Sequence, residues 1–160
     1  MKRSFRLSDD ELKDFMQYAK PVAGDNRVRR MRGFIQHGAT TTYAHSLSVA
    51  YTAFLINRRL GIKTDEKSLI KAALLHDYFL YDWHDHGDRL HGYHHPDIAG
   101  MNARRDFDIT DKEYDMIASH MWPLTLFHIP RSKEGWILTL ADKICSSKEV
   151  IRSTVPSAED

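Results

Sequence analysis

The chain has 160 residues, of which 42% are hydrophobic and 28% are charged, and its formal net charge is +1. This composition is typical of a soluble globular protein with one core, and the near-neutral charge gives no bulk electrostatic footprint for nucleic acid or an anionic membrane. The one cysteine, Cys145, excludes an intramolecular disulfide framework and a multi-cysteine zinc ribbon. No apolar stretch approaches the roughly 20 residues of a membrane-spanning helix, and no signal-peptide core follows the N-terminus, so we expect a cytoplasmic protein.

The first half of the chain has helical periodicity, and no alternating run predicts a strand. A capping box at residues 8–11 opens the first helix, and Pro21 is expected to close it. Gly38 and Gly61 are the expected stop signals of the second and third helices. The four helices expected here cover residues 9–20, 25–37, 42–60 and, starting at 64 or 65, up to 77.

The second half begins with a segment rich in His, Asp and Gly, residues 81–94, which is expected to be irregular. A fifth helix should follow His95, because Pro96 is tolerated in a first turn. A second capping box, at residues 110–113, opens a sixth helix that should end around Met121. We therefore predict an all-α fold in a single compact helical domain. Its expected parts are N-terminal helices over 1–36, a core over about 37–150 that ends in a helix from 132 or 133 to 151, and a frayed tail over 152–160.

Imidazole and carboxylate groups share the apolar faces of four predicted helices. His45 lies on one stripe with apolar residues four, eight and eleven positions later, and Asp142 interrupts an apolar run. The pair His76-Asp77 ends another apolar run, and His120 follows apolar residues three and four positions earlier. Buried carboxylates are rare unless a positive group offsets their desolvation. A hydrogen-bonded core histidine explains any one of these residues, whereas a shared metal ion explains all five.

The ordered series His45, His76-Asp77 and Asp142 resembles the signature of the HD-domain superfamily of metal-dependent phosphohydrolases, over roughly residues 37–150. The resemblance implies a helix bundle of the HD type in which these four residues hold a first metal ion. Nitrogen and oxygen ligands without thiolate suit a divalent transition metal, which leaves Fe, Mn, Zn, Co and Ni open.

Two further histidines extend the resemblance. His95 and His120 are similar to the extra histidines of the subgroup that binds two metal ions. This implies that Asp77 bridges to a second ion and is the catalytic residue, with a metal-activated water as nucleophile. The lysine that often follows the His-Asp pair in the family is absent here.

The expected substrate is a small molecule with a phosphate ester or phosphoanhydride, a nucleotide being the first candidate, because the layout of residues 109–144 is similar to HD enzymes that cleave dinucleoside polyphosphates. Lys143 is the first candidate for phosphate binding. His84, His94 and His37 are further candidates, although a solvated surface or a helix-end position explains each of them as well.

Three alternatives to a hydrolase stay open at this point. A di-iron HD-type oxygenase would use a similar ligand set, and a non-catalytic module would bind metal and nucleotide without turnover. A helical domain with hydrogen-bonded core histidines is the plainest interpretation. Nucleic-acid and membrane partners are not expected, and a homo-oligomer is left open.

Overall fold

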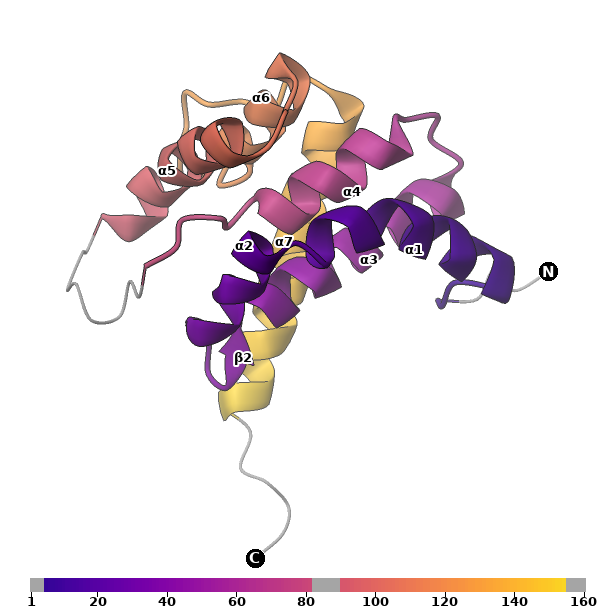
Figure 1. Cartoon of the computed structure of the whole chain (residues 1–160), viewed down its shortest axis with the longest axis horizontal. Helices are drawn as coiled ribbons and strands as arrows, with labels where there is room; N and C mark the ends of the chain where they lie inside the picture. The colour runs from indigo at the N-terminus through magenta and orange to yellow at the C-terminus, as the bar shows by residue number, and fades with distance from the viewer. Residues whose placement is uncertain (1–4, 82–89, 155–160) are drawn as a thin grey trace, which may run out of the picture.

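The computed structural model describes residues 5–81 and 90–154, and within them the predicted all-α fold is confirmed, with one short β-hairpin added (Figure 1). The elements in chain order are α1 Asp9–Ala23, α2 Asn26–Arg29, the 3-10 helix η1 Arg30–Gly33, β1 Ile35–His37, β2 Thr40–Thr41, α3 Thr42–Leu60, α4 Glu66–Leu75, α5 His91–Asp106, α6 Asp111–Ser119 and α7 Lys133–Thr154.

The start of α1 follows the sequence prediction, but its end does not. The Ser8 side chain accepts a hydrogen bond from the Glu11 amide, and the Glu11 carboxylate accepts one from the Ser8 amide, which completes the capping box. The expectation that Pro21 closes this helix was wrong. Pro21 lies exposed in the last turn, and the helix continues to bury Val22 and Ala23 in the core.

The predicted helix over residues 25–37 was also wrong. The chain makes one short helix and a 3-10 turn, and it then enters a hairpin in which β1 pairs antiparallel with β2. Gly38 occupies the turn with a φ of +55°, a conformation that glycine adopts without strain. The hairpin points Gln36 inward, where it is buried, and leaves Ile35 exposed. A helical prediction misses this alternation because it spans only three residues.

The long helix α3 begins and ends where the sequence predicts. Thr41 caps its N-terminus, and Gly61 ends it in the left-handed region with a φ of +64°. The next helix, α4, stops at Leu75, so His76 is its C-terminal cap and Asp77 lies just beyond. The position of the His-Asp pair is therefore set by the end of a helix.

The prediction for α5 placed its start too late. The helix begins at His91, and Pro96 lies inside it. Backbone hydrogen bonds from Tyr93 and His94 to the Leu90 carbonyl nucleate the helix ahead of the proline. Residues 91–94 are thus helical where an irregular segment is expected, and residues 82–89 of that segment lie outside the described residues.

The last two helices match their predictions to within three residues. The capping box of Thr110 and Glu113 opens α6, which ends at Ser119 with His120 as its cap. Helix α7 starts at Lys133, as predicted, and runs to Thr154, beyond the expected end.

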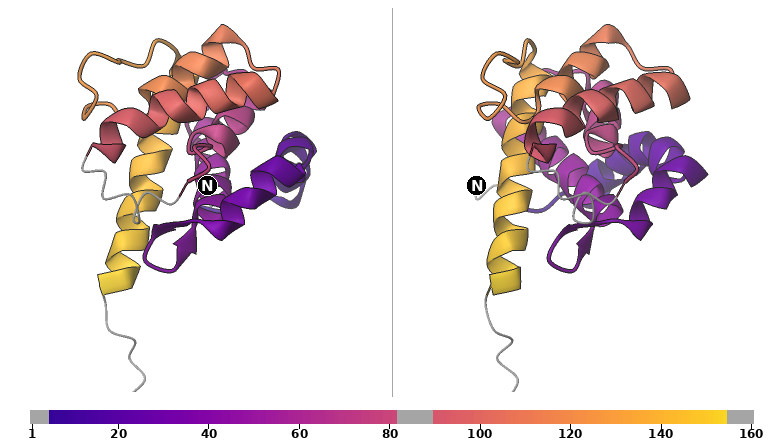
Figure 2. Two further views of the ribbon diagram at one scale, coloured as in Figure 1. Left: turned by 60° about the vertical axis from the view of Figure 1, so that its left-hand side comes forward. Right: turned by 90° about the vertical axis from the view of Figure 1, so that its left-hand side faces the viewer.

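Helix α4 lies at the centre of the bundle, packed against α1, α3, α6 and α7. Its apolar run is almost entirely inaccessible to solvent, and it shares one core with Phe54, Met116 and Leu138. Figure 2 shows α7 running the length of the molecule, with α6 near its N-terminal end and the hairpin beside its C-terminal half. Because α4 is central, the side chains at its C-terminal end emerge in the interior of the protein.

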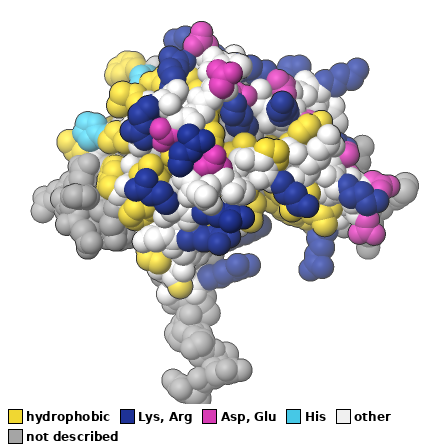
Figure 3. All heavy atoms as spheres, in the orientation of Figure 1, with side chains coloured by type: hydrophobic (Ala, Val, Ile, Leu, Met, Phe, Trp, Pro, Cys, Tyr) yellow, Lys and Arg dark blue, Asp and Glu magenta, His cyan; other side chains and the backbone are white. Residues whose placement is uncertain are grey.

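The surface carries charged side chains of both signs. On the face in Figure 3, Lys and Arg are spread over much of the surface, with Asp and Glu between several of them. Some form ion pairs between elements, such as Arg58 with Glu66 at 2.6 Å and Arg59 with Glu11 at 2.7 Å. Among the helices described, none has both the length and the apolar character needed to cross a membrane.

Candidate metal centre

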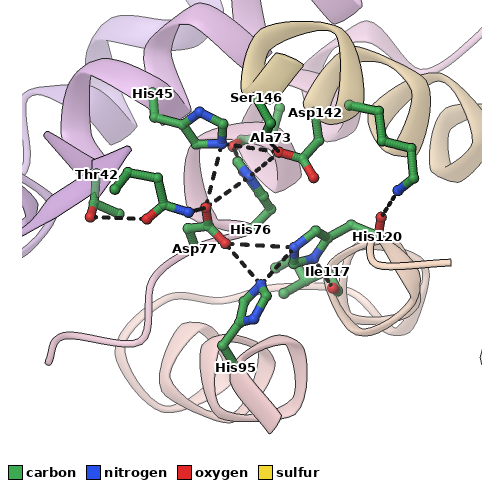
Figure 4. A network of polar contacts seen from close by, with 12 residues as sticks. Thr42, His45, Ala73, His76, Asp77, His95, Ile117, His120, Asp142 and Ser146 are labelled. Carbon is green, nitrogen blue, oxygen red and sulfur yellow. Dashed lines mark hydrogen bonds and ion pairs between the residues drawn. The ribbon is translucent and has the colours of Figure 1, made fainter. Parts of the chain in front are cut away.

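Six side chains named by the sequence meet in the interior, from five helices or helix ends (Figure 4). All six are buried, with relative exposures of 6% or less. They are His45 on α3, His76 and Asp77 at the end of α4, His95 on α5, His120 at the end of α6 and Asp142 on α7.

One part of the cluster contains two imidazoles and two carboxylates. The Nε2 atom of His45 lies 3.0 Å from Oδ1 of Asp142, and Nε2 of His76 lies 3.4 Å from the same oxygen. These two nitrogens also lie 3.5 and 3.2 Å, respectively, from Oδ2 of Asp77. The ligand atoms of His45, His76 and Asp142 lie close enough together to hold one metal ion, and Oδ2 of Asp77 lies beside them.

The other part of the cluster is built on the second oxygen of Asp77. Oδ1 lies 3.2 Å from Nε2 of His95 and 3.5 Å from Nε2 of His120. The two imidazole nitrogens are themselves 3.0 Å apart. Asp77 therefore presents one oxygen to each part of the cluster.

The far side of each ring is held by an acceptor, so the ring nitrogens have defined roles. Nδ1 of His76 donates to the Ala73 carbonyl at 2.6 Å, and Nδ1 of His120 donates to the Ile117 carbonyl at 2.7 Å. Both histidines cap a helix end, where backbone carbonyls lack helical partners. Nδ1 of His95 donates to the His91 carbonyl at 2.9 Å. In the neutral form, each Nε2 atom then carries a lone pair that points inward.

His45 differs from the other three histidines because its Nδ1 faces a carboxylate. Oε2 of Glu149 lies 2.9 Å from this nitrogen, and Oε1 lies 3.1 Å away. The Nδ1–H group donates to Glu149, and Nε2 of His45 also points into the cluster. All four imidazoles thus direct the same atom toward Asp77 and Asp142.

The residues present fit a bound cation. His76 Nε2 and Asp77 Oδ1 are buried and have no hydrogen-bond partner among the described residues. Such atoms carry a desolvation cost that a cation removes. A bound cation would also stabilise the Nε2 atoms of His95 and His120. Their lone pairs lie 3.0 Å apart and repel each other unless a positive charge lies near them.

The electrostatics of the cluster also favour positive charge. Burial by itself would lower the pKa of His45, but hydrogen bonds with Asp142 and Glu149 raise this pKa to about 9. The pKa of His76 is also raised against the effect of burial, by the negative charges of Asp77 and Asp142. The pKa of Asp77 lies well below its usual range despite burial, because the neighbouring histidines stabilise the carboxylate. Protons on these imidazoles supply the charge that a metal ion would otherwise bring.

A cavity of about 780 Å³ opens beside the cluster and reaches Asp77, His95, His120 and Asp142. Its wall includes Lys143 and His37, two of the predicted substrate-binding residues. His94 is exposed on α5 and does not belong to the wall of this cavity, and His84 lies outside the described residues.

Two residues that contact the cluster, Gln36 and Glu149, are not among the residues that the sequence predicts for the site. Gln36 Nε2 donates to Asp77 Oδ2 at 2.7 Å, and the Thr42 hydroxyl donates to Gln36 Oε1 at 3.3 Å, which orients the amide. No signal marked Gln36, because its segment was predicted as a helix. Glu149 follows Asp142 by seven positions on one helix, so it shares a face with Asp142, and this spacing was a usable signal. For His91 the sequence leaves open a role in binding phosphate or moving protons and a place in a solvated loop; the structure buries it in the cavity wall, one helical turn before His95.

Comparison with known proteins agrees with this geometry. The family model of the HD domain matches residues 42–146, about two thirds of the chain. The chain belongs to the HD-domain family. HD domains bind divalent metals, and the family consists largely of metal-dependent phosphohydrolases. All six clustered residues lie inside the matched range, whereas Gln36 and Glu149 lie outside it. Comparison of this chain with the curated proteins found no match, and neither did comparison with the solved structures.

Proposed function

We propose that this protein is a metal-dependent phosphohydrolase that cleaves a phosphate ester or phosphoanhydride in a small molecule, a nucleotide being the first candidate. The single observation that carries the proposal is the convergence of four imidazole Nε2 atoms on two buried carboxylates, beside an open cavity. Membership of the HD-domain family supports the same chemistry.

Each of the two parts of the cluster would hold one ion. His45, His76, Asp77 and Asp142 would hold the first ion, and Asp77, His95 and His120 would hold the second. A bound divalent metal supplies a water of lowered pKa and neutralises charge on phosphate oxygens. The ligand set suits Fe, Mn, Zn, Co or Ni without selecting one of them.

The protein residues around the cavity would bind and orient the substrate. The Lys143 ammonium donates to the His120 carbonyl at 3.2 Å, which uses one of its three protons and keeps the side chain at the cavity wall. Burial lowers the pKa of Lys143 because it removes water from around the ammonium group. A phosphate that binds to this ammonium group therefore competes with fewer water molecules. Met121 and Leu124 form an apolar part of the wall, where the organic part of a substrate can pack.

Asp77 has the central role in this proposal. Gln36 holds one of its oxygens and the ring nitrogens surround both, so the carboxylate has one orientation. A carboxylate fixed in this way would be a ligand of both ions, whose positive charge would stabilise a bound phosphate. Asp77 is the residue we propose as catalytic.

The test begins with metal-free protein that is reloaded with one metal at a time. Metal content is measured first, and hydrolysis of phosphomonoesters, phosphodiesters, nucleotides and a dinucleoside polyphosphate is then followed by chromatography of the products. We expect bound metal and metal-dependent hydrolysis, both lost in His76→Ala and both kept in His128→Ala, which removes an exposed imidazole. Absence of metal above background would contradict the proposal.

The same experiment separates the alternatives. Each reaction is run with and without oxygen, because a di-iron oxygenase would need oxygen and would consume it. Metal binding without turnover of any substrate would instead indicate a binding module.

A further inference from the structure

Glu149 is the carboxylate that distinguishes His45 from the other imidazoles of the cluster. The other three rings donate Nδ1–H to neutral backbone carbonyls, whereas His45 donates to a side-chain carboxylate at 2.9 Å. The Glu149 side chain is only 10% exposed, so water competes little with this contact. Glu149 lies on α7 beyond the range matched by the HD-domain model, and neither the family match nor the proposed ligand set includes it.

The position of Glu149 beside His45 is fixed by helix α7 and by the packing of α7 against the hairpin. Asp142 and Glu149 lie two turns apart on the same face of α7, and they approach opposite nitrogens of the His45 ring. The C-terminal half of α7 is held against the hairpin, since a Cβ at Gly38 would lie only 2.8 Å from Cβ of Ser153. Ser153 is one turn beyond Glu149, so the hairpin also fixes the part of α7 that carries this carboxylate.

We propose that Glu149 is a positioning residue for His45, which keeps the proton on Nδ1, directs the Nε2 lone pair into the cluster and strengthens binding of the first metal ion. A carboxylate behind a metal-binding imidazole fixes the orientation of the ring and makes it a stronger electron donor than a carbonyl does. This inference rests on the proposed function, because it concerns the metal held by His45.

The proposed role of Glu149 predicts a measurable loss of metal affinity when this residue is replaced. Removing an outer partner of a metal-binding histidine typically costs about 10–100-fold in metal affinity. Glu149→Ala removes both the charge and the hydrogen bond, so we expect a loss in that range for the tighter ion. Glu149→Gln keeps the length and one acceptor oxygen, and it should lose less affinity than Glu149→Ala.

The experiment measures Zn²⁺ affinity by competition with a chromophoric chelator, the number of bound ions by elemental analysis, and the visible absorption spectrum of the Co²⁺-loaded protein. Glu66→Gln is the matched control, since it removes a partly buried carboxylate that pairs with Arg58 on another surface. We expect the control to lower the metal-free melting temperature without changing Zn²⁺ affinity. The Glu149 variants should change both the affinity and the Co²⁺ spectrum, because the spectrum reports the ligands of the metal.

The outcomes separate this inference from the proposed function. If the unaltered protein binds no metal, the proposed function fails and this inference fails with it. If the unaltered protein binds metal and Glu149→Ala binds it equally well, only the role of Glu149 is refuted. Should Glu149→Ala not fold, Glu149→Gln decides, and an affinity and a Co²⁺ spectrum equal to those of the unaltered protein would overturn the proposal.

Discussion

Asp77→Asn is the substitution with the largest expected effect, because both oxygens of this carboxylate face the cluster. Oδ2 lies within 3.5 Å of two imidazole nitrogens, and Oδ1 lies within 3.5 Å of two others. The asparagine side chain keeps the volume but loses the charge. Its NH₂ group can also donate to the lone pairs of His95 and His120, which occupies the atoms that would bind a cation.

The size of the effect follows from linkage. At free metal about 100 times Kd, binding stabilises the folded protein by about 2.7 kcal/mol. For a chain of this length, roughly 2–4 °C per kcal/mol converts this into a melting shift of about 5–10 °C. Loss of a shared ligand should weaken binding at least about 100-fold, the upper end for outer partners. At the same metal concentration, the stabilisation then falls to about 0.4 kcal/mol and the shift to about 1 °C.

The assay compares thermal melts with chelator and with metal for the unaltered protein, Asp77→Asn and Asp108→Asn. Asp108 is an exposed carboxylate, so the same chemical change there should leave the metal-dependent shift intact. Hydrolysis of the same substrate panel is measured on the same samples and should disappear only in Asp77→Asn. A full metal-dependent shift together with retained activity in Asp77→Asn would refute this account of the site.

Three further predictions concern the substrate and the fold. Lys143→Gln should raise KM for a phosphate substrate at least about 10-fold at unchanged metal content, because a charged hydrogen bond contributes roughly 1.5–3 kcal/mol; steady-state kinetics with an unchanged KM would contradict it. The Arg59 hydrogen bond lowers the pKa of Glu11 from 4.5 to about 2, so the stability advantage over Glu11→Gln should be full above pH 4.5 and should be lost toward pH 2, as measured by denaturant unfolding. Gly61→Ala should lower the free energy of unfolding by about 1 kcal/mol, or Tm by roughly 2–4 °C, because φ at this position is positive. A Cβ there would meet no described atom within 4 Å, so the loss would come from the backbone conformation and not from crowding.

Much of the helical architecture was already determined by the sequence. The capping boxes of α1 and α6 and the glycine after α3 are local signals, and each acts through hydrogen bonds or backbone angles within a few residues. The apolar run of α4 predicted a buried helix, and the His-Asp pair at its end therefore had to lie in the interior. The same periodicity directed His45 and Asp142 inward, which is why the cluster was predictable as a set of residues.

The tertiary structure decided which residues hold the side chains of Asp77 and His45 in place. Gln36 reaches Asp77 across 41 residues of sequence, and Glu149 reaches His45 across 104. Neither contact has a local signature, because a hairpin of a few residues and the far end of α7 become neighbours only when the helices pack. The start of α5 ahead of Pro96 was likewise decided by backbone hydrogen bonds that composition does not reveal. Local periodicity selects which side chains face the core, and backbone carbonyls three or four residues earlier orient three of the four imidazole rings. Long-range packing orients the fourth ring, His45, and brings Gln36 to Asp77.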